Sequence, residues 1–112
     1  MKSKRETTIE AEPGICTLIN VFTVAPEKQQ ALIDLLDAAT EEVMRHQAGF
    51  ISANIHRSLD GRHVANYAQW ETAEAFQSML HNPEAQSHMN RAAAMATGFE
   101  PILYQVGSVH HI

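Results

Sequence analysis

The sequence contains only one cysteine, Cys16, among its 112 residues. A single cysteine cannot form an internal disulfide, and it excludes zinc or redox sites of the CxxC type. Basic residues are also few: 8 Lys and Arg stand against 13 Asp and Glu, and the formal net charge is -5. Because binding to a phosphate backbone requires a basic surface, nucleic acid is not expected as a partner.

Long hydrophobic runs are absent as well. No segment reaches the roughly 20 apolar residues of a membrane helix, and no apolar stretch of a secretory signal follows the polar residues 1–12. We therefore expect a cytoplasmic protein without membrane contact. Hydrophobic residues still make up 45% of the chain, which is enough for one modest core. We expect a flexible arm over residues 1–13 and a single domain over residues 14–112.

The local motifs of the common enzyme classes are missing too. The chain has no GxGxxG, P-loop, GxSxG or HExxH sequence. Its seven histidines include no pair at the i, i+4 spacing of a helical metal site. Neither a metal nor a nucleotide cofactor is therefore indicated by a motif.

Hydrophobic patterning predicts four strands and two helical regions. The strands are expected over residues 15–24, 50–58, 63–70 and 102–109. The first helix should run from Pro26 to about Gln47, and the second region should begin at Thr72, break at Asn82-Pro83 and end near Thr97-Gly98. The order β-α-β-β-α-β is that of an α+β ferredoxin-like fold.

The first predicted strand is apolar on both of its faces. Leu18 and Phe22 lie on one face by alternation, whereas Ile19 and Val21 lie on the other. In this fold the helices cover one face of the sheet, and a large exposed apolar patch is rare in monomers. We therefore expect a homodimer that packs sheet against sheet, as in a dimeric α+β barrel. The alternative is a single chain whose twisted sheet tolerates the exposed apolar residues.

Polar residues within the apolar strands are the candidates for chemistry. Asn20 interrupts the first strand, and alternation places Asn66 and Trp70 on one face of the third. A buried amide without a partner costs about 1–3 kcal/mol. If all three side chains face the helices, two carboxamides and an indole N–H converge on one cavity suited to a developing oxyanion. The alternative interpretation is that each is an ordinary core residue.

The second helical region contributes the remaining candidates. His88 and Arg91 lie on the helix that should cover this space, and the alternative for each is a solvated position on the helix surface. Met79, with Met89 and Met95, is expected to be flexible core filler that also shapes an adaptable cavity.

Three stretches resemble the antibiotic biosynthesis monooxygenase superfamily. The family's first strand resembles residues 17–24 (TLINVFTV), and its helix-to-strand junction resembles residues 46–50 (HQAGF). Its third strand and the helix that follows resemble residues 63–76 (HVANYAQWETAEAF). The resemblance spans roughly residues 15–108 and is strongest to small oxygenases that convert anthrones or naphthacenones to quinones.

The resemblance implies an activity and a set of site residues. It implies a cofactor-independent monooxygenase, in which an aromatic substrate loses a proton and itself reduces dioxygen without flavin or metal. The family's two asparagines and tryptophan correspond to Asn20, Asn66 and Trp70 as catalytic residues. A helix Arg of some members corresponds to Arg91, and Phe76 stands where others have Tyr. The substrate-binding candidates are then Phe22, Phe76, Met79, His88 and Arg91.

Two other functions fit the same fold. Haem-degrading relatives also use an asparagine of the first strand, but Met79 occupies their Trp position and His88 is one residue out of register with their His ligand. The third possibility is a dimeric module that binds small hydrophobic molecules without catalysis, because a fold alone does not determine function.

Overall fold

A computed structural model describes residues 5–112 of the chain. One four-stranded antiparallel sheet has the strand order β2-β3-β1-β4. Its strands are β1 (Cys16–Thr23), β2 (Phe50–Arg57), β3 (His63–Trp70) and β4 (Gly98–Tyr104). The helices are α1 (Gln29–Glu42), α2 (Ala73–Leu80) and α3 (Pro83–Met95), and the short 3₁₀ turns η1 (Pro26–Lys28) and η2 (Met44–His46) flank α1. No helix within the described residues is long and apolar enough to span a membrane.

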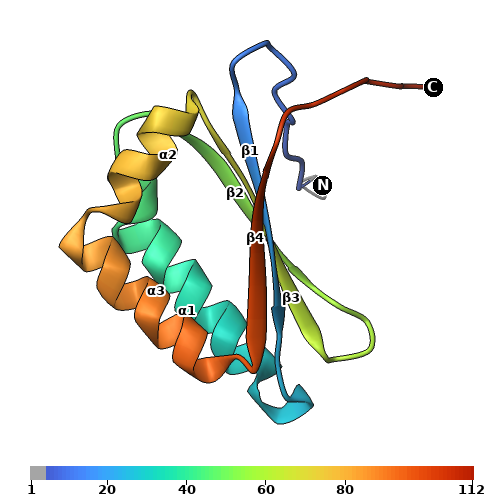
Figure 1. The fold of residues 1–112 in the computed structure, drawn as a ribbon. Coiled ribbons are helices and arrows are strands. Elements are labelled where there is room, and N and C mark those ends of the chain that lie inside the picture. The colour runs from blue at the N-terminus through green and yellow to red at the C-terminus, as the bar shows by residue number, and fades with distance from the viewer. Residues whose placement is uncertain (1–4) are drawn as a thin grey trace.

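The helices form a single layer on one face of the sheet (Figure 1). The strand order and the alternation of strands and helices confirm the predicted α+β ferredoxin-like fold. In the view of Figure 1 the described segment before β1 and the segment after β4 lie on the opposite side of the sheet from the helices. The protein is therefore a two-layer structure, and any space between the layers is bounded by the inner face of the sheet and by the helices.

Short side chains begin the two later helices, as the sequence indicates. The Thr72 hydroxyl oxygen accepts a hydrogen bond from the Ala75 backbone N–H at 3.0 Å. The Asn82 side chain accepts from the backbone N–H groups of Glu84 and Ala85 at 2.9 and 3.1 Å. Each cap satisfies backbone donors that a helix start leaves free. Pro83 follows at the first helical position, so the break between α2 and α3 lies where it was predicted.

The last strand differs from the prediction of residues 102–109. β4 begins at Gly98 and ends at Tyr104. The chain leaves α3 directly into pairing with β1, because the Thr97 backbone N–H donates to the Thr23 carbonyl at 2.8 Å and Gly98 is already opposite Thr23. Pro101 fits within this strand because β4 lies at the edge of the sheet, where proline removes no obligatory ladder bond.

Part of the N-terminal arm is held against the outer face of the sheet. Residues 1–4 of the predicted arm lie outside the described residues. Further along, the buried Gln69 side chain accepts from the Glu10 backbone N–H at 2.8 Å and donates to the Glu10 carbonyl at 3.0 Å. The same amide donates to the Thr17 hydroxyl at 2.9 Å. Through these bonds, Gln69 of β3 holds the arm at Glu10 against the sheet.

Candidate active site

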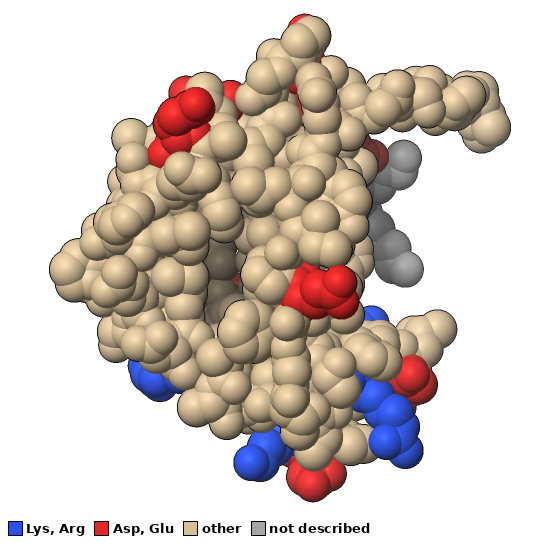
Figure 2. Space-filling view, in the orientation of Figure 1, with Lys and Arg blue, Asp and Glu red and all other residues tan. Residues whose placement is uncertain are grey.

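A cavity of about 470 Å³ lies between the helical layer and the inner face of the sheet. Figure 2 shows a hollow that opens between the helices and β4, and the surface around this opening is mostly uncharged. The volume lies within the range of small-molecule sites, which are typically concave and apolar with a few placed polar groups.

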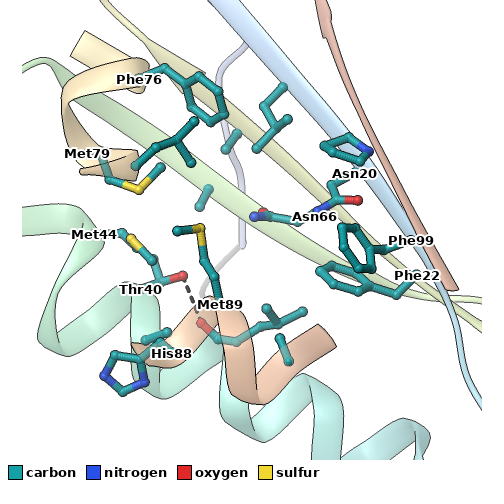
Figure 3. A pocket seen from close by; sticks show the side chains of 18 of the residues that line it. Asn20, Phe22, Thr40, Met44, Asn66, Phe76, Met79, His88, Met89 and Phe99 are labelled. Atoms are coloured by element: carbon teal, nitrogen blue, oxygen red, sulfur yellow. Dashed lines mark hydrogen bonds between the residues drawn. The ribbon is translucent and has the colours of Figure 1, made fainter. Parts of the chain in front are cut away.

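The sheet wall of the cavity carries the three residues that the strands were predicted to bring together. Asn20 of β1 and both Asn66 and Trp70 of β3 line the cavity, with Phe22 beside them. Asn20 and Asn66 are directly opposite each other in the antiparallel register of β1 and β3, a relation that brings Cβ atoms to about 5 Å. Figure 3 shows the two carboxamides side by side on this wall. The geometric prediction is therefore confirmed.

Four polar atoms of the cavity wall are buried without a hydrogen-bond partner among the described residues. They are Oδ1 of Asn20, Oδ1 of Asn66, Nε1 of Trp70 and Nδ1 of His88. Leaving such an atom unpaired costs about 1–3 kcal/mol, and buried polar groups in native proteins are nearly always paired. Two carboxamide oxygens, an indole N–H and an imidazole nitrogen in the cavity wall are therefore left without a protein partner among the described residues.

Aromatic contacts hold Trp70 in place. Its side chain is 1% exposed, and its ring meets Phe50 edge-on with centroids 5.4 Å apart. Phe76 of α2 packs on the same ring at a centroid distance of 6.2 Å. Because edge-to-face packing of this kind fixes ring orientation, the indole N–H keeps one direction.

The helical wall is soft and mostly apolar, with Thr40, His88 and Asn90 as its polar residues. Phe76 and Met79 of α2, Met44 of α1 and Met89 of α3 line it. Thr40 also lines the cavity, but its hydroxyl donates to the Leu36 backbone carbonyl at 2.8 Å (Figure 3). Thioether side chains adapt their shape readily, so this wall can adjust to the outline of a ligand.

The structure does not bring Arg91 to the cavity. Arg91 is exposed on α3 and is not among the lining residues. Successive helical residues are about 100° apart, so Arg91 lies roughly 200° around the helix from Met89, which faces the cavity. His88 is only about 100° from Met89; it is half-buried and does line the cavity.

Sequence reasoning missed the wall formed by the edge strand. Phe99, Pro101 and Leu103 of β4 all line the cavity, and the Phe99 ring packs against Phe22 with centroids 6.2 Å apart. Their i, i+2 spacing is the signal that places them on one strand face. Because the last strand was predicted to start at residue 102, this spacing was not recognised.

Charged groups are excluded from the site. The only lining residue with an ionisable side chain, within residues 5–112, is His88. Cys16 is buried nearby in the core, where burial and then the Glu74 carboxylate raise the pKa of its thiol. The described part of the chain contains no group of three or more His, Cys, Asp and Glu placed to hold a metal ion.

Comparisons with known proteins agree with this architecture. The family model for antibiotic biosynthesis monooxygenases matches residues 15–91. Tetracenomycin-F1 monooxygenase of Streptomyces glaucescens is 43% identical over 99 residues, which cover 88% of each chain. This match shows that the chain is a monooxygenase.

Solved structures show the same fold. The monooxygenase from the gene ActVA-Orf6 of Streptomyces coelicolor, in complex with nanaomycin D, superposes with a TM-score of 0.77 at 24% identity, covering 88% of this chain and 92% of that one. SnoaB, a cofactor-independent oxygenase from Streptomyces nogalater, gives a TM-score of 0.70 at 24% identity, covering 86% and 96%. With this fold, this cavity and the sequence match over most of its length, the chain belongs to the antibiotic biosynthesis monooxygenase family.

Proposed function

We propose that this protein is a polyketide-tailoring oxygenase that oxidises an aromatic phenol, anthrone or quinol-type substrate to a quinone with dioxygen. The observation that carries the proposal is the set of unpaired polar atoms of Asn20, Asn66 and Trp70 in an otherwise apolar cavity. The 43% identical relative is named for its action on tetracenomycin F1, and a structural neighbour binds nanaomycin D. Both names point to aromatic polyketides.

The chemistry requires orientation and charge stabilisation from the protein. An anthrone CH₂ group loses a proton to become an electron-rich carbanion, the carbanion reduces O₂ to a carbon-bound peroxide, and loss of water leaves the quinone carbonyl. One oxygen atom ends in the quinone and the other in water. Because the substrate supplies the electrons, the proposal includes no flavin or metal.

Each named side chain has a role in this proposal. The carboxamides of Asn20 and Asn66 can turn their N–H₂ groups towards an oxyanion, and the Trp70 indole N–H donates beside them. The aromatic and thioether side chains exclude water and hold the flat rings, the role we assign to Phe22, Phe76, Met79 and the missed Phe99. His88 contacts the substrate from the helical side. Arg91 has no role here.

Oxygen uptake tests the proposal. Metal-stripped, flavin-free protein is expected to consume O₂ with dithranol, a hydroxylated anthrone, and to release the matching anthraquinone in equal amount. The measurement is an oxygen-electrode trace with chromatography of the product. Uptake no faster than the autoxidation of dithranol in buffer would contradict the proposal. Addition of haemin to a parallel sample separates the haem-degrading alternative, which predicts a shifted Soret band and loss of haem with a reductant.

We also propose that two chains pair through the outer face of the sheet. Apolar side chains of this face are exposed in the single chain: Val21 is 38%, Ile102 41% and Tyr104 46% exposed. Large exposed apolar patches are rare on monomers, and a second sheet packed against this face removes these side chains from water.

Light scattering after gel filtration measures the pairing. The protein is expected to elute at twice its 12.4 kDa mass, and Val21→Glu combined with Ile102→Glu should give a monomer because charge is placed in the buried centre. The matched control is Leu59→Glu, since Leu59 is fully exposed in the turn between β2 and β3 and lies in neither strand. A monomeric wild-type protein would refute the dimer.

A further inference from the structure

The cavity has one side chain that can accept a proton. Its lining consists of aliphatic, aromatic, thioether, hydroxyl and carboxamide groups, and among the described residues His88 alone adds a basic one. Carboxamides and an indole are not bases near neutral pH, whereas a neutral imidazole accepts a proton there. The composition of the lining therefore singles out His88 for any step in which the substrate loses a proton.

The position of His88 suits this task. Nδ1 is buried without a partner among residues 5–112, although the residue as a whole is half-buried. The tautomer with its hydrogen on Nε2 leaves a free lone pair on Nδ1. His88 lines the cavity from the helical side, and Figure 3 shows its imidazole beside the helices, beyond Thr40 and apart from the carboxamides of Asn20 and Asn66.

We propose that His88 is the general base of the reaction and accepts the proton that the substrate loses before it reacts with dioxygen. This inference rests on the proposed function. The two walls of the cavity then have different roles. The residues of the sheet wall stabilise negative charge on the substrate, and His88 on the helical wall accepts the proton. The separation keeps the imidazolium from bonding directly to the amides.

His88 alone can carry out every proton transfer of the reaction, and the substrate supplies all the electrons that reduce dioxygen. The C–H bond of the substrate breaks, its electron pair stays on carbon, and the proton moves to the imidazole. The carbanion transfers electrons to O₂ and a C–O bond forms, after which the imidazolium returns its proton to the peroxide. Neutral imidazole then removes the second proton from the same carbon as the O–O bond breaks. The imidazolium gives that proton to the departing hydroxide, which leaves as water.

In the described part of the chain, no Asp, Glu, Lys or Arg side chain lines the cavity beside His88. The charged residues on the helices packed around it are exposed and none lines the cavity: Asp34, Asp37, Glu41 and Glu42 on α1, Glu74 on α2, and Glu84 and Arg91 on α3. Arg45, which follows α1, pairs with Glu41 at 2.6 Å on the surface. The sheet strands contribute only neutral side chains to the lining. Within residues 5–112, His88 is thus the one ionisable side chain that lines the site.

The test compares His88→Gln with His81→Gln in the full-length protein. Glutamine keeps a polar side chain of similar reach but cannot accept the proton. We expect His88→Gln to lower kcat/KM for dithranol about 10²-fold, the lower range for general-base catalysis. In the wild type kcat/KM should fall at acid pH, because a protonated imidazole cannot act as a base, and this acid limb should vanish in the variant. His81 is exposed, with Nδ1 2.8 Å from the Gln77 carbonyl, and serves as the matched control.

An anaerobic measurement separates this inference from the function itself. Without O₂, wild-type protein should bind dithranol and develop the absorbance of its anion, whereas His88→Gln should bind it with a similar Kd and leave it neutral. If the wild type neither binds nor oxidises dithranol, the proposed function fails. If the wild type oxidises dithranol and folded His88→Gln keeps its rate, its acid limb and the anion band, the general-base assignment is wrong while the function stands.

Discussion

Replacing Asn66 with alanine is expected to lower kcat for dithranol oxidation by about 10²- to 10³-fold, the effect of removing one oxyanion donor from a water-excluded site. The same substitution should leave thermal stability unchanged or slightly higher. The Asn66 Oδ1 atom is buried without a partner, so its removal breaks no protein hydrogen bond and relieves a desolvation cost of about 1–3 kcal/mol. Steady-state kinetics and a thermal melt measure the two quantities.

A lower kcat without a loss of thermal stability distinguishes a catalytic role of Asn66 from a structural one. A structural asparagine loses stability when it is truncated, whereas a ligand-facing one loses activity. Asn54→Ala is the matched control, because Asn54 also lies in a strand of the same sheet but does not line the cavity. Asn66→Ala with a kcat like that of the Asn54 variant would remove the carboxamide from the mechanism and leave it as a core residue.

Gly49→Ala is expected to destabilise the fold by about 2–5 kcal/mol. Gly49 has φ of +83° and a Cβ added there would lie 2.5 Å from the Cβ of Ala75 on α2. The left-handed backbone costs a non-glycine residue about 1–2 kcal/mol, and overpacking adds about 1–3 kcal/mol. Gly49 cannot move aside easily, since its carbonyl accepts from the Glu71 backbone N–H at 2.7 Å. Urea denaturation measures the change in unfolding free energy.

Gly14→Ala separates the two contributions. Gly14 has a similar φ of +94° with nothing within 4 Å of the added Cβ, so this variant should lose only the backbone part, about 1–2 kcal/mol. Equal losses at both positions would show that α2 moves without cost. A larger loss at Gly49 would show that its contact with Ala75 sets how closely α2, with Phe76 and Met79, approaches the cavity.

Local signals were sufficient to predict most of the fold. The strand His63–Trp70 occurs with the predicted bounds, and Thr72 and Asn82 begin their helices through side-chain caps. These features depend on residues a few positions apart, so they can be read from the chain. The shared face of Asn66 and Trp70 follows from strand alternation for the same reason.

Features that depend on distant pairing were predicted less well. β4 begins at Gly98 because Thr97 and Gly98 pair with Thr23, more than seventy positions earlier. The second helical region was predicted to end near Thr97-Gly98 and the last strand to begin only at residue 102. The error concealed Phe99, Pro101 and Leu103, which close one side of the cavity. Arg91, a substrate-binding candidate taken from the resemblance, is exposed and does not line the cavity, because the resemblance did not determine the helical register.

The sequence by itself determined the kinds of elements, their order and the face on which each strand residue lies, because backbone periodicity and capping are local properties. Only the tertiary structure decided that Asn20 lies directly opposite Asn66, that the edge strand completes the cavity and that, among residues 5–112, His88 is its one ionisable lining residue. These relations arise from strand register and helix packing, in which residues far apart in the chain come into contact. The chemistry we propose depends on those contacts.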